Sequence, residues 1–277
     1  MQKLIKLVVF SLLIIVGGNL RSQTLKIVSF NIRYNPYYQT DGINCWDNRR
    51  DAVVRMIEDE EPDAIGLQEA LPDQLEYLDK HLLNYRRIGV GRDNGIDGGE
   101  FMAIYYNIKH LELVSATTRW LSETPCTPSL GWDAACNRTV TIARFRDRRS
   151  KKEFVYLNTH LDHVGTAART NSTQLIANMI SERLDKNTPL IVGGDMNSTI
   201  KDPIFQSFYN IGLQDARKMP RRTSNSITYN AFGNNVGATI DHFFIRAMKV
   251  KRFRTLNRNY GVPYISDHYP IEIRVQL

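Results

Sequence analysis

Polar residues follow several apolar, strand-like runs of this 277-residue chain at the point where each run ends. They carry carboxylate, amide or imidazole groups, and they are Asn31 after LKIVSF, Glu69 after AIGLQ, His160 after FVYLNT, Asp195 and Asn197 after LIVGG, Asp241 after ATI, and Asp267 with His268 before YPIEI. One polar residue at such a place is ordinarily a turn or cap residue. Six such sites are harder to explain that way. If the strands share sheets, their ends converge at one edge, where these groups would suit a hard divalent cation and a phosphate.

The carboxylates are the candidate metal ligands. Mg²⁺ prefers about six oxygen ligands and keeps several waters, so one or two protein carboxylates suffice. Glu69 would be held rigidly at a strand end, Asp267 could supply a second oxygen, and Asn31 a neutral one. Taken alone, Glu69 could also be an acid at a helix N-terminus that stabilises the following helix through its dipole.

The segment GGDMN places a carboxylate and an amide directly after an apolar run. Two glycines let the backbone turn tightly. Asp195 could then point inward to hold a water nucleophile, and Asn197 could donate a hydrogen bond to a phosphate oxygen. An ordinary Gly-Asp turn is the alternative. The motif by itself is a weak signal, and it becomes informative together with the other candidate site residues.

Two histidines lie in similar positions, His160 in NTHLDH and His268 in SDHYP. An imidazole can donate to a phosphoryl oxygen or stabilise its developing charge. Asp241 could orient His268 and favour its protonated form, although a lone histidine is more often structural. We expect His242, next to Asp241 on a strand, to face the opposite side, and the role of His163 stays open.

Hydrophobic periodicity predicts the elements that position these groups. Helices are predicted over residues 46–59, 71–82, 167–184 and 203–211. Strands are predicted over residues 25–30, 64–67, 86–90, 101–106, 111–120, 139–146, 153–160, 190–192, 239–245, 250–256 and 271–275. Strands outnumber helices and several are joined as hairpins, which favours an α/β sandwich over a doubly wound sheet.

The motifs SFNIR, LQE, NTHLD, GDMN, IDHFF and SDHYP, in this order, resemble the endonuclease/exonuclease/phosphatase superfamily, the group that includes deoxyribonuclease I, exonuclease III and the sphingomyelinases. The resemblance spans about residues 25–277. It implies a four-layer α/β sandwich, with two packed mixed β-sheets flanked by helices, and a phosphoester hydrolase that depends on Mg²⁺ or Mn²⁺. The segments DGINCWDNRRD and THLDHVGTAARTNSTQLI resemble the secreted bacterial members.

The resemblance also implies a role for each residue. The metal ligands would be Asn31, Glu69 and Asp267. The catalytic residues would be His160, Asp195, Asn197, Asp241 and His268. The phosphate would be bound by Arg138, Asn197 and His268. Asp195 would position or deprotonate the attacking water, and His160 would stabilise the phosphate or protonate the leaving group. Arg138 could alternatively support a loop.

Residues 1–22 are typical of a secretory signal peptide, because two lysines precede the apolar stretch of residues 7–16 and small and polar residues follow up to Ser22. Residues 23–277 would then be the catalytic domain, exported to the periplasm or the extracellular space. An uncleaved anchor is the alternative, but the stretch is shorter than the roughly 20 residues of a membrane span. We therefore expect no stable membrane insertion after cleavage. We also expect the mature protein to be a monomer.

The formal net charge of the chain is +7. A basic balance suits an anionic substrate without demanding one. The run RFRDRRSKK at residues 144–152 is most simply a solvated hairpin, and a nucleic-acid-binding patch is the alternative. An exported chain could oxidise a pair of cysteines, and Cys126 and Cys136 are the expected pair because they are close together in a loop-like stretch, which would leave Cys45 free.

The substrate depends on the loops around the site, over residues 34–46, 89–100, 121–137, 162–169 and 223–236. The first hypothesis is a hydrolase of small phosphomonoesters or phosphodiesters. The second is a secreted nuclease, which should show a continuous basic groove. The third is an exported binding protein that keeps the fold without turnover, but no candidate catalytic residue is missing.

Overall fold

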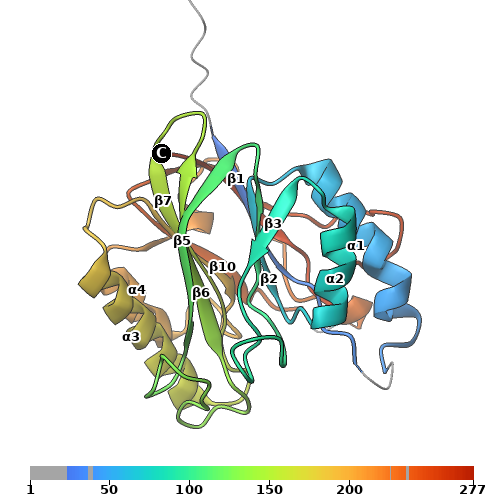
Figure 1. Cartoon of the computed structure of the whole chain (residues 1–277), viewed down its shortest axis with the longest axis horizontal. Helices are drawn as coiled ribbons and strands as arrows, with labels where there is room; N and C mark the ends of the chain where they lie inside the picture. The colour runs from blue at the N-terminus through green and yellow to red at the C-terminus, as the bar shows by residue number, and fades with distance from the viewer. Residues whose placement is uncertain (1–23, 37–39, 225, 235–236) are drawn as a thin grey trace, which may run out of the picture.

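The computed structural model describes residues 24–36, 40–224, 226–234 and 237–277. In these residues two six-stranded mixed β-sheets pack face to face, and helices cover both outer surfaces (Figure 1). This arrangement confirms the predicted four-layer α/β sandwich. The predicted signal peptide, residues 1–22, lies outside the described residues. Within the described part of the chain, no helix combines the length and the apolar character that a membrane crossing requires.

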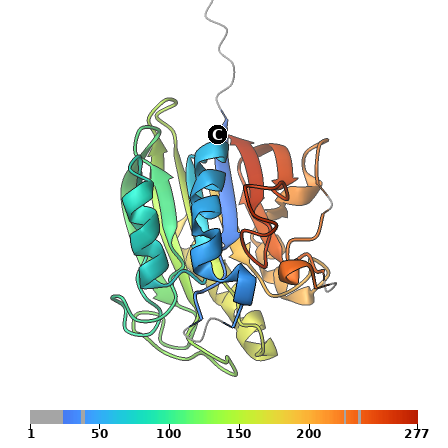
Figure 2. The same cartoon turned by 90° about the vertical axis from the view of Figure 1, so that its right-hand side faces the viewer.

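The first sheet has the strand order β11-β12-β1-β2-β4-β3, and only β1 and β2 pair in parallel. Its strands are β1 (Leu25–Asn31), β2 (Ala64–Gln68), β3 (Tyr85–Ile88), β4 (Ile104–Asn107), β11 (Lys249–Thr255) and β12 (Ile271–Gln276). The helices α1 (Trp46–Glu60) and α2 (Pro72–His81) cover its outer face and stand in front of it in Figure 2.

The second sheet has the order β5-β6-β7-β8-β10-β9, and only β7 and β8 pair in parallel. Its strands are β5 (Leu111–Trp120), β6 (Thr139–Asp147), β7 (Glu153–His160), β8 (Leu190–Asp195), β9 (Gln214–Asp215) and β10 (Asp241–Arg246). The helices α3 (Thr166–Arg183) and α4 (Gln206–Asn210) cover its outer face. Single 3₁₀ turns span Gly42–Asn44, Pro203–Phe205, Ala216–Lys218 and Ala231–Gly233.

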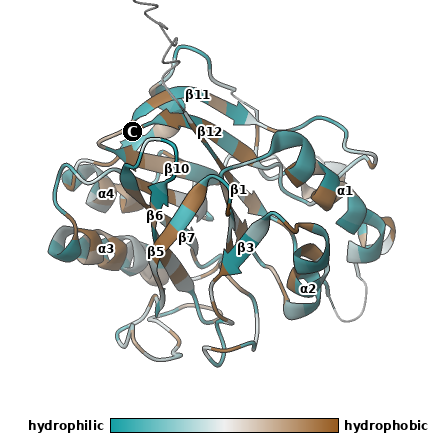
Figure 3. Ribbon diagram, turned by 45° about the horizontal axis from the view of Figure 1, so that its top comes forward, coloured by the Kyte–Doolittle hydropathy of each residue, from teal (hydrophilic) through white to brown (hydrophobic). Residues whose placement is uncertain are grey.

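Apolar side chains form three layers of core between the four layers of structure. Adjacent residues of β1 serve different layers, since Val28 packs toward α1 and α2 while Ile27 packs between the two sheets. Ile176 of α3 and Val192 of β8 belong to the third layer. Burial on both faces favours consecutive apolar residues, which explains the adjacent Ile27 and Val28 in β1. The helices α1 and α2 are largely hydrophilic on their outward side (Figure 3).

One strand differs from its prediction in a way that bears on function. β8 was expected over residues 190–192 with a glycine turn after it, but it continues to Asp195. A side chain at Gly193 would collide with the ring of Phe243, and one at Gly194, where φ is +149°, would collide with the backbone of Thr159. The glycines therefore permit close packing of neighbouring strands, and the expected tight turn is wrong.

The expected disulfide between Cys126 and Cys136 is also wrong. All three cysteines are free thiols. Cys126 is exposed, whereas the half-buried Cys136 directs its Sγ toward Asp162, at 3.9 Å from Oδ2. The two thiols thus lie in different surroundings. Cys45 is unpaired, as predicted.

Candidate active site

The two parallel pairs and their antiparallel neighbours bring the predicted residues to one edge of the sandwich. β1, β2, β7 and β8 end there, and β10 and β12 begin there. In the register of the second sheet, Asp195 is flanked by His160 on one side and by Asp241 on the other. Asn31, at the end of β1, reaches Asp195 from the first sheet. The predicted convergence of strand ends is therefore confirmed.

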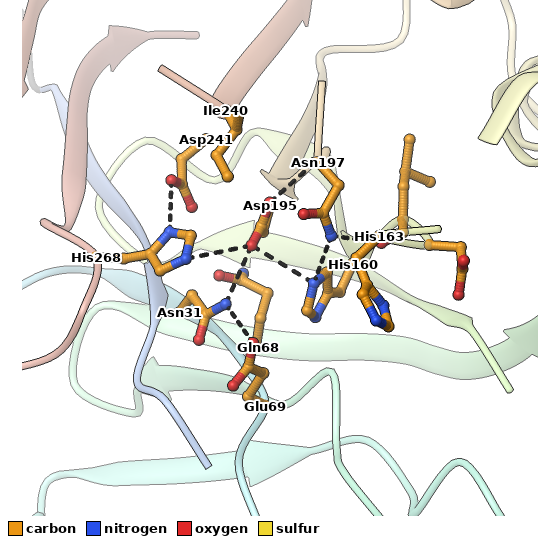
Figure 4. Close-up of polar contacts among 12 residues, drawn as sticks. Asn31, Gln68, Glu69, His160, His163, Asp195, Asn197, Ile240, Asp241 and His268 are labelled. Carbon is orange, nitrogen blue, oxygen red and sulfur yellow. Dashed lines mark hydrogen bonds and ion pairs between the residues drawn. The ribbon is translucent and has the colours of Figure 1, made fainter. Parts of the chain in front are cut away.

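Asp195 is the centre of this cluster (Figure 4). Its Oδ2 lies 3.1 Å from Asn31 Nδ2, from which it accepts a hydrogen bond, and 3.4 Å from His160 Nε2. Its Oδ1 accepts a hydrogen bond of 2.9 Å from the backbone N–H of Asn197. Burial raises the pKa of Asp195 to about 7, an effect that His268 opposes and Asp241 reinforces. A carboxylate with a near-neutral pKa is suited to act as a general base.

His268 and Asp241 form a buried pair beside Asp195. His268 Nδ1 donates to Asp241 Oδ2 at 2.9 Å. Its Nε2 lies 3.6 Å from Asp195 Oδ2, which is too long for a hydrogen bond, so the second N–H is unspent. Burial disfavours the charged imidazole, but the carboxylates of Asp241 and Asp195 outweigh it and raise the pKa of His268 to about 10. His268 is therefore an imidazolium with one donor available to a ligand.

His160 has the opposite character. Asn197 Nδ2 donates both to the Leu161 carbonyl, at 2.9 Å, and to His160 Nε2, at 3.0 Å. Nε2 is thus an acceptor, and the ring is neutral with its proton on Nδ1. Burial, together with the positive charges of Arg138 and Arg92, lowers the pKa of His160 well below its usual range. The buried Nδ1 finds no hydrogen-bond partner in the described part of the chain.

Asn197 therefore holds His160 in place. Its backbone has φ +47°, and its side-chain amide already spends both hydrogens on its two partners. The predicted donation from Asn197 to a phosphate oxygen would require one of these hydrogen bonds to be exchanged.

The predicted metal ligands lie across the pocket floor from this pair of histidines. Glu69 follows β2 with a strained backbone, at φ +63°. Its Oε1 accepts from Asn31 Nδ2 at 2.9 Å, and its Oε2 accepts from the backbone N–H of Tyr34 at 3.1 Å. Asp267 Oδ1 accepts from Ser266 Oγ at 3.1 Å. Burial raises the pKa of Asp267, His268 opposes that rise, and the negative charge of Glu69 adds to it.

The charge of the site favours a bound cation. Asp195, Asp241, Glu69 and Asp267 supply four carboxylates, whereas His268 supplies one imidazolium and Arg33 Nε lies 4.0 Å from Asp267 Oδ2. Neither Glu69 nor Asp195 has an arginine or lysine ion-pair partner in the described residues. Oxygen ligands with excess negative charge are what Mg²⁺ and Mn²⁺ require, so the residues present fit such an ion.

Asp195, Asp241 and His268 also lie close enough together to be considered as metal ligands, with the ligand atoms within 4.8 Å of one another. The His268–Asp241 distance of 2.9 Å is that of a direct hydrogen bond, so these two atoms are already paired with each other. Glu69 and Asp267 are therefore the better candidates for a metal, and His268 is hydrogen-bonded to Asp241 while Asp195 lies 3.6 Å from its Nε2.

A fully buried polar network lies beneath the site and joins the sheets. Gln68 Nε2 donates to Asn158 Oδ1 at 2.6 Å and to Ser29 Oγ at 3.1 Å. Asn158 Nδ2 donates to the backbone carbonyls of Leu67 and Ala103. Gln68 Oε1 has no hydrogen-bond partner among the described residues, but the four hydrogen bonds of this buried network tie neighbouring strands together. The network therefore holds in place the strand ends that carry the site residues.

The site residues form the floor of a pocket of about 720 Å³. Each of the five loops expected to surround the site contributes to its lining, with Tyr34, Arg92 and Glu100, Cys136, His163, and Tyr229. This volume lies in the range of about 300–1,000 Å³ that is usual for small-molecule sites.

Arg138 supports a loop, which is the alternative role that the sequence left open, while its predicted phosphate binding stays a prediction. Its Nε donates to Asp162 Oδ2 at 3.1 Å, and its Nη2 donates to His163 Nδ1 at 2.9 Å, which supports the loop after β7. It also lines the pocket. His163 therefore belongs to the pocket wall. His242 faces away from Asp241, as predicted, and contacts the Ser198 carbonyl at 2.9 Å.

Comparison with known proteins assigns the chain to a family. Residues 28–268 match the sequence profile of the Endonuclease/Exonuclease/phosphatase family. The chain belongs to this family. A family member from Bacteroides vulgatus is 33% identical to it, with 92% of this chain and 99% of that chain covered and a TM-score of 0.86. A mannosyl-6-phosphatase from Bacteroides thetaiotaomicron is 32% identical, with 91% and 100% covered and a TM-score of 0.86.

The human Nocturnin catalytic domain, 19% identical with 93% and 94% of the chains covered and a TM-score of 0.72, shares the fold. Membership in the endonuclease/exonuclease/phosphatase family confirms the sequence resemblance. It also confirms the class of enzyme, a phosphoester hydrolase, that the resemblance implied.

Sequence reasoning did not single out Arg92 and Glu100, which line the pocket. They bound the glycine- and aspartate-rich loop over residues 91–100. The sequence pattern that could have identified them is an arginine and a glutamate near the two ends of such a loop.

Proposed function

We propose that this protein is a divalent-metal-dependent phosphatase that releases phosphate from small phosphomonoesters by direct attack of water. The observation that carries the proposal is the placement of Asp195 beside the hydrogen-bonded His268–Asp241 pair at the floor of a pocket of small-molecule size. The proposal includes export of residues 23–277, for which the signal-like residues 1–22 are the support.

Asp195 acts as the base in this proposal. Its near-neutral pKa allows it to accept a proton from the attacking water, and Asn31 and the backbone of Asn197 fix its orientation. Fixing the water and the phosphate against each other removes much of the entropic cost of the reaction.

His268 acts as the electrostatic partner of the phosphoryl group. Asp241 accepts its Nδ1–H, so the ring presents its charged Nε2–H to the pocket. A preorganised charged donor stabilises the negative charge that grows on the phosphoryl oxygens. His160 lines the same pocket but is neutral, so it adds no positive charge there.

Glu69 and Asp267 would hold the cation, with Asn31 beside them. Mg²⁺ or Mn²⁺ bound there would neutralise negative charge on the phosphoryl oxygens. Glu69 accepts hydrogen bonds from two neutral donors, the Asn31 side chain and the Tyr34 backbone, and has no arginine or lysine ion pair in the described residues, which supports this assignment.

The charges of the pocket wall favour a small substrate over a nucleic acid. Each arginine in the wall is already paired with a carboxylate: Arg33 with Asp41 at 3.0 Å, Arg92 with Glu100 at 2.5 Å, and Arg138 with Asp162 at 3.1 Å. A nuclease gains affinity from arginines and lysines that neutralise successive phosphates, and paired arginines provide little of that. The basic run at residues 144–152 includes the turn between β6 and β7, at the end of the sheet opposite His160.

The nature of the alcohol is suggested by similarity. The mannosyl-6-phosphatase from Bacteroides thetaiotaomicron shares 32% identity over its whole length. We therefore propose that the substrate is a sugar phosphate. The polar lining of the pocket supports this, since few apolar side chains contribute to it.

The proposed function is tested by offering the protein, as residues 23–277, a panel of substrates with Mg²⁺, with Mn²⁺ or with EDTA. The panel holds mannose 6-phosphate, a nucleoside monophosphate, bis-p-nitrophenyl phosphate, plasmid DNA and RNA. We expect metal-dependent release of phosphate from the sugar phosphate and no cutting of either nucleic acid. Metal-dependent cutting of DNA or RNA without release from the monoesters would show that the protein is a nuclease.

Glu69→Gln is expected to weaken Mn²⁺ binding about 100-fold, because the number of charged oxygen ligands sets the affinity of such sites. Calorimetric titration of the metal into the protein measures this without reference to activity. Glu123→Gln is the matched control, since Glu123 is exposed on a loop and does not line the pocket. Equal affinities for the two variants would exclude Glu69 as a ligand.

A further inference from the structure

The pair Arg92–Glu100 lies in the pocket wall and has no part in the chemistry described above. Arg92 Nη1 donates to Glu100 Oε2 at 2.5 Å, and the backbone N–H of Arg92 donates to the Glu100 carbonyl at 3.1 Å. Both side chains line the pocket and are 14% exposed. The pair is thus mostly shielded from solvent but open to a ligand.

The loop that carries the pair is held rigidly. Asn94 Oδ1 accepts hydrogen bonds from the backbone N–H groups of Ile96, Asp97 and Gly98, which closes the loop on itself. The Arg92 carbonyl accepts from Trp120 Nε1 at 2.6 Å and from Asn137 at 3.3 Å. A site built on a preorganised loop loses little entropy when it binds a ligand.

The pair is close to the reacting end of the pocket. Arg92 is one of the cations that, after burial, lower the pKa of His160. Burial, followed by the negative charge of Glu69, raises the pKa of Glu100 to about 7. Arg92, Glu100, His160 and Glu69 all line the same pocket, so the pair lies in the wall that a group attached to the phosphate can reach.

The pair has unused hydrogen-bonding atoms of both kinds. Within the described chain, Glu100 Oε1 accepts no hydrogen bond and Arg92 Nη2 donates none. A hydroxyl group both donates and accepts. Adjacent hydroxyls on a ring can therefore donate to the carboxylate and accept from the guanidinium. A second anionic group would not gain from this pair, because its two charges compensate each other.

We propose that Arg92 and Glu100 form the subsite that binds the hydroxyl groups of the leaving alcohol and so select a sugar phosphate over phosphates of apolar alcohols. This inference rests on the proposed phosphatase function and names the residues that determine its specificity. The pair determines which alcohol is accepted, while Asp195 and His268 act on the phosphate.

The test compares two substrates in each variant. Mannose 6-phosphate carries ring hydroxyls, whereas cyclohexylmethyl phosphate has a six-membered ring and a primary alkoxide leaving group without any hydroxyl. The measured quantity is the ratio of their kcat/KM values, because a loss of folded protein cancels in that ratio. Glu100→Gln should lower the ratio about tenfold, since hydrogen bonds to a charged group are roughly twice as strong as neutral ones.

Arg92→Met is the second variant and should lower the same ratio by about tenfold or more, because it removes the donor entirely. Glu123→Gln, on the neighbouring loop and outside the pocket, should leave the ratio at the wild-type value.

Three outcomes would overturn the inference. If Glu100→Gln and Arg92→Met reduce kcat/KM for both substrates by equal factors, the pair has no role in selecting the alcohol. If the wild-type protein hydrolyses both substrates equally well, the inference is wrong while the phosphatase function stands. If the wild-type protein hydrolyses neither, the proposed function is wrong and this inference with it.

Discussion

Replacing Asp195 by asparagine is expected to lower kcat about 10⁴-fold, the upper end of what a general base contributes. The amide has the size of the carboxylate but cannot accept a proton from water. Asp195 Oδ2 also lies 3.4 Å from His160 Nε2 and 3.6 Å from His268 Nε2. The substitution therefore removes a negative charge from beside both histidines. Steady-state phosphate release at saturating substrate measures the effect.

The control for Asp195→Asn is Asp185→Asn, which makes the same chemical change at an exposed position just beyond α3. Both variants should retain the wild-type circular dichroism spectrum, and Asp185→Asn should retain wild-type activity. An Asp195→Asn variant that is folded and within tenfold of the wild-type kcat would remove Asp195 from the role of base.

Replacing His268 by glutamine is expected to lower kcat by about 10²- to 10³-fold, the usual cost of removing one preorganised donor from developing charge. Glutamine keeps a neutral N–H but loses the positive charge that Asp241 and Asp195 sustain. A kcat within a few-fold of the wild-type value would show that the imidazolium does not act on the phosphate.

The pH profile gives this prediction a second measurement. His268 has its pKa raised to about 10 and must be protonated to act, so wild-type kcat/KM should fall as the pH rises through about 10. Asp195 has its pKa raised to about 7 and must be deprotonated, so the rate should rise through about 7. In His268→Gln the fall at high pH should disappear while the rise is kept. A fall that persists would have to come from another group.

The chemical residues of the site were predictable from the sequence because they occupy strand ends. In a sheet whose neighbours run parallel, the carboxyl ends meet at one edge, so Asp195 and His160 had to be near each other once β7 and β8 were paired. β10 and β12 run antiparallel to β8 and β1, so they begin at the edge where β8 and β1 end. Asp241, at the start of β10, and His268, shortly before β12, therefore lie at the same edge. Hydrophobic periodicity is a local property that the sequence shows directly, whereas the order of the strands within each sheet follows from the tertiary fold.

The walls of the pocket were not predictable in the same way. Arg92 and Glu100 meet because the backbone of residues 91–100 closes on itself through Asn94, and no periodic pattern encodes that path. The same holds for Cys136, whose orientation toward Asp162 follows from the course of a long loop. Gly193 and Gly194 show a related limit, since a glycine permits a turn and close packing equally well.

The most direct test of the proposed mechanism is hydrolysis of mannose 6-phosphate in water enriched in ¹⁸O, with Mg²⁺, by the protein as residues 23–277 and by its Asp195→Asn variant. The mechanism predicts that the wild-type protein releases phosphate that carries a single ¹⁸O atom, that the oxygen on carbon 6 of the sugar remains unlabelled, and that the variant releases almost no phosphate. Absence of phosphate release by the wild-type protein, or ¹⁸O on carbon 6 of the sugar, would contradict attack on phosphorus by a water held at Asp195.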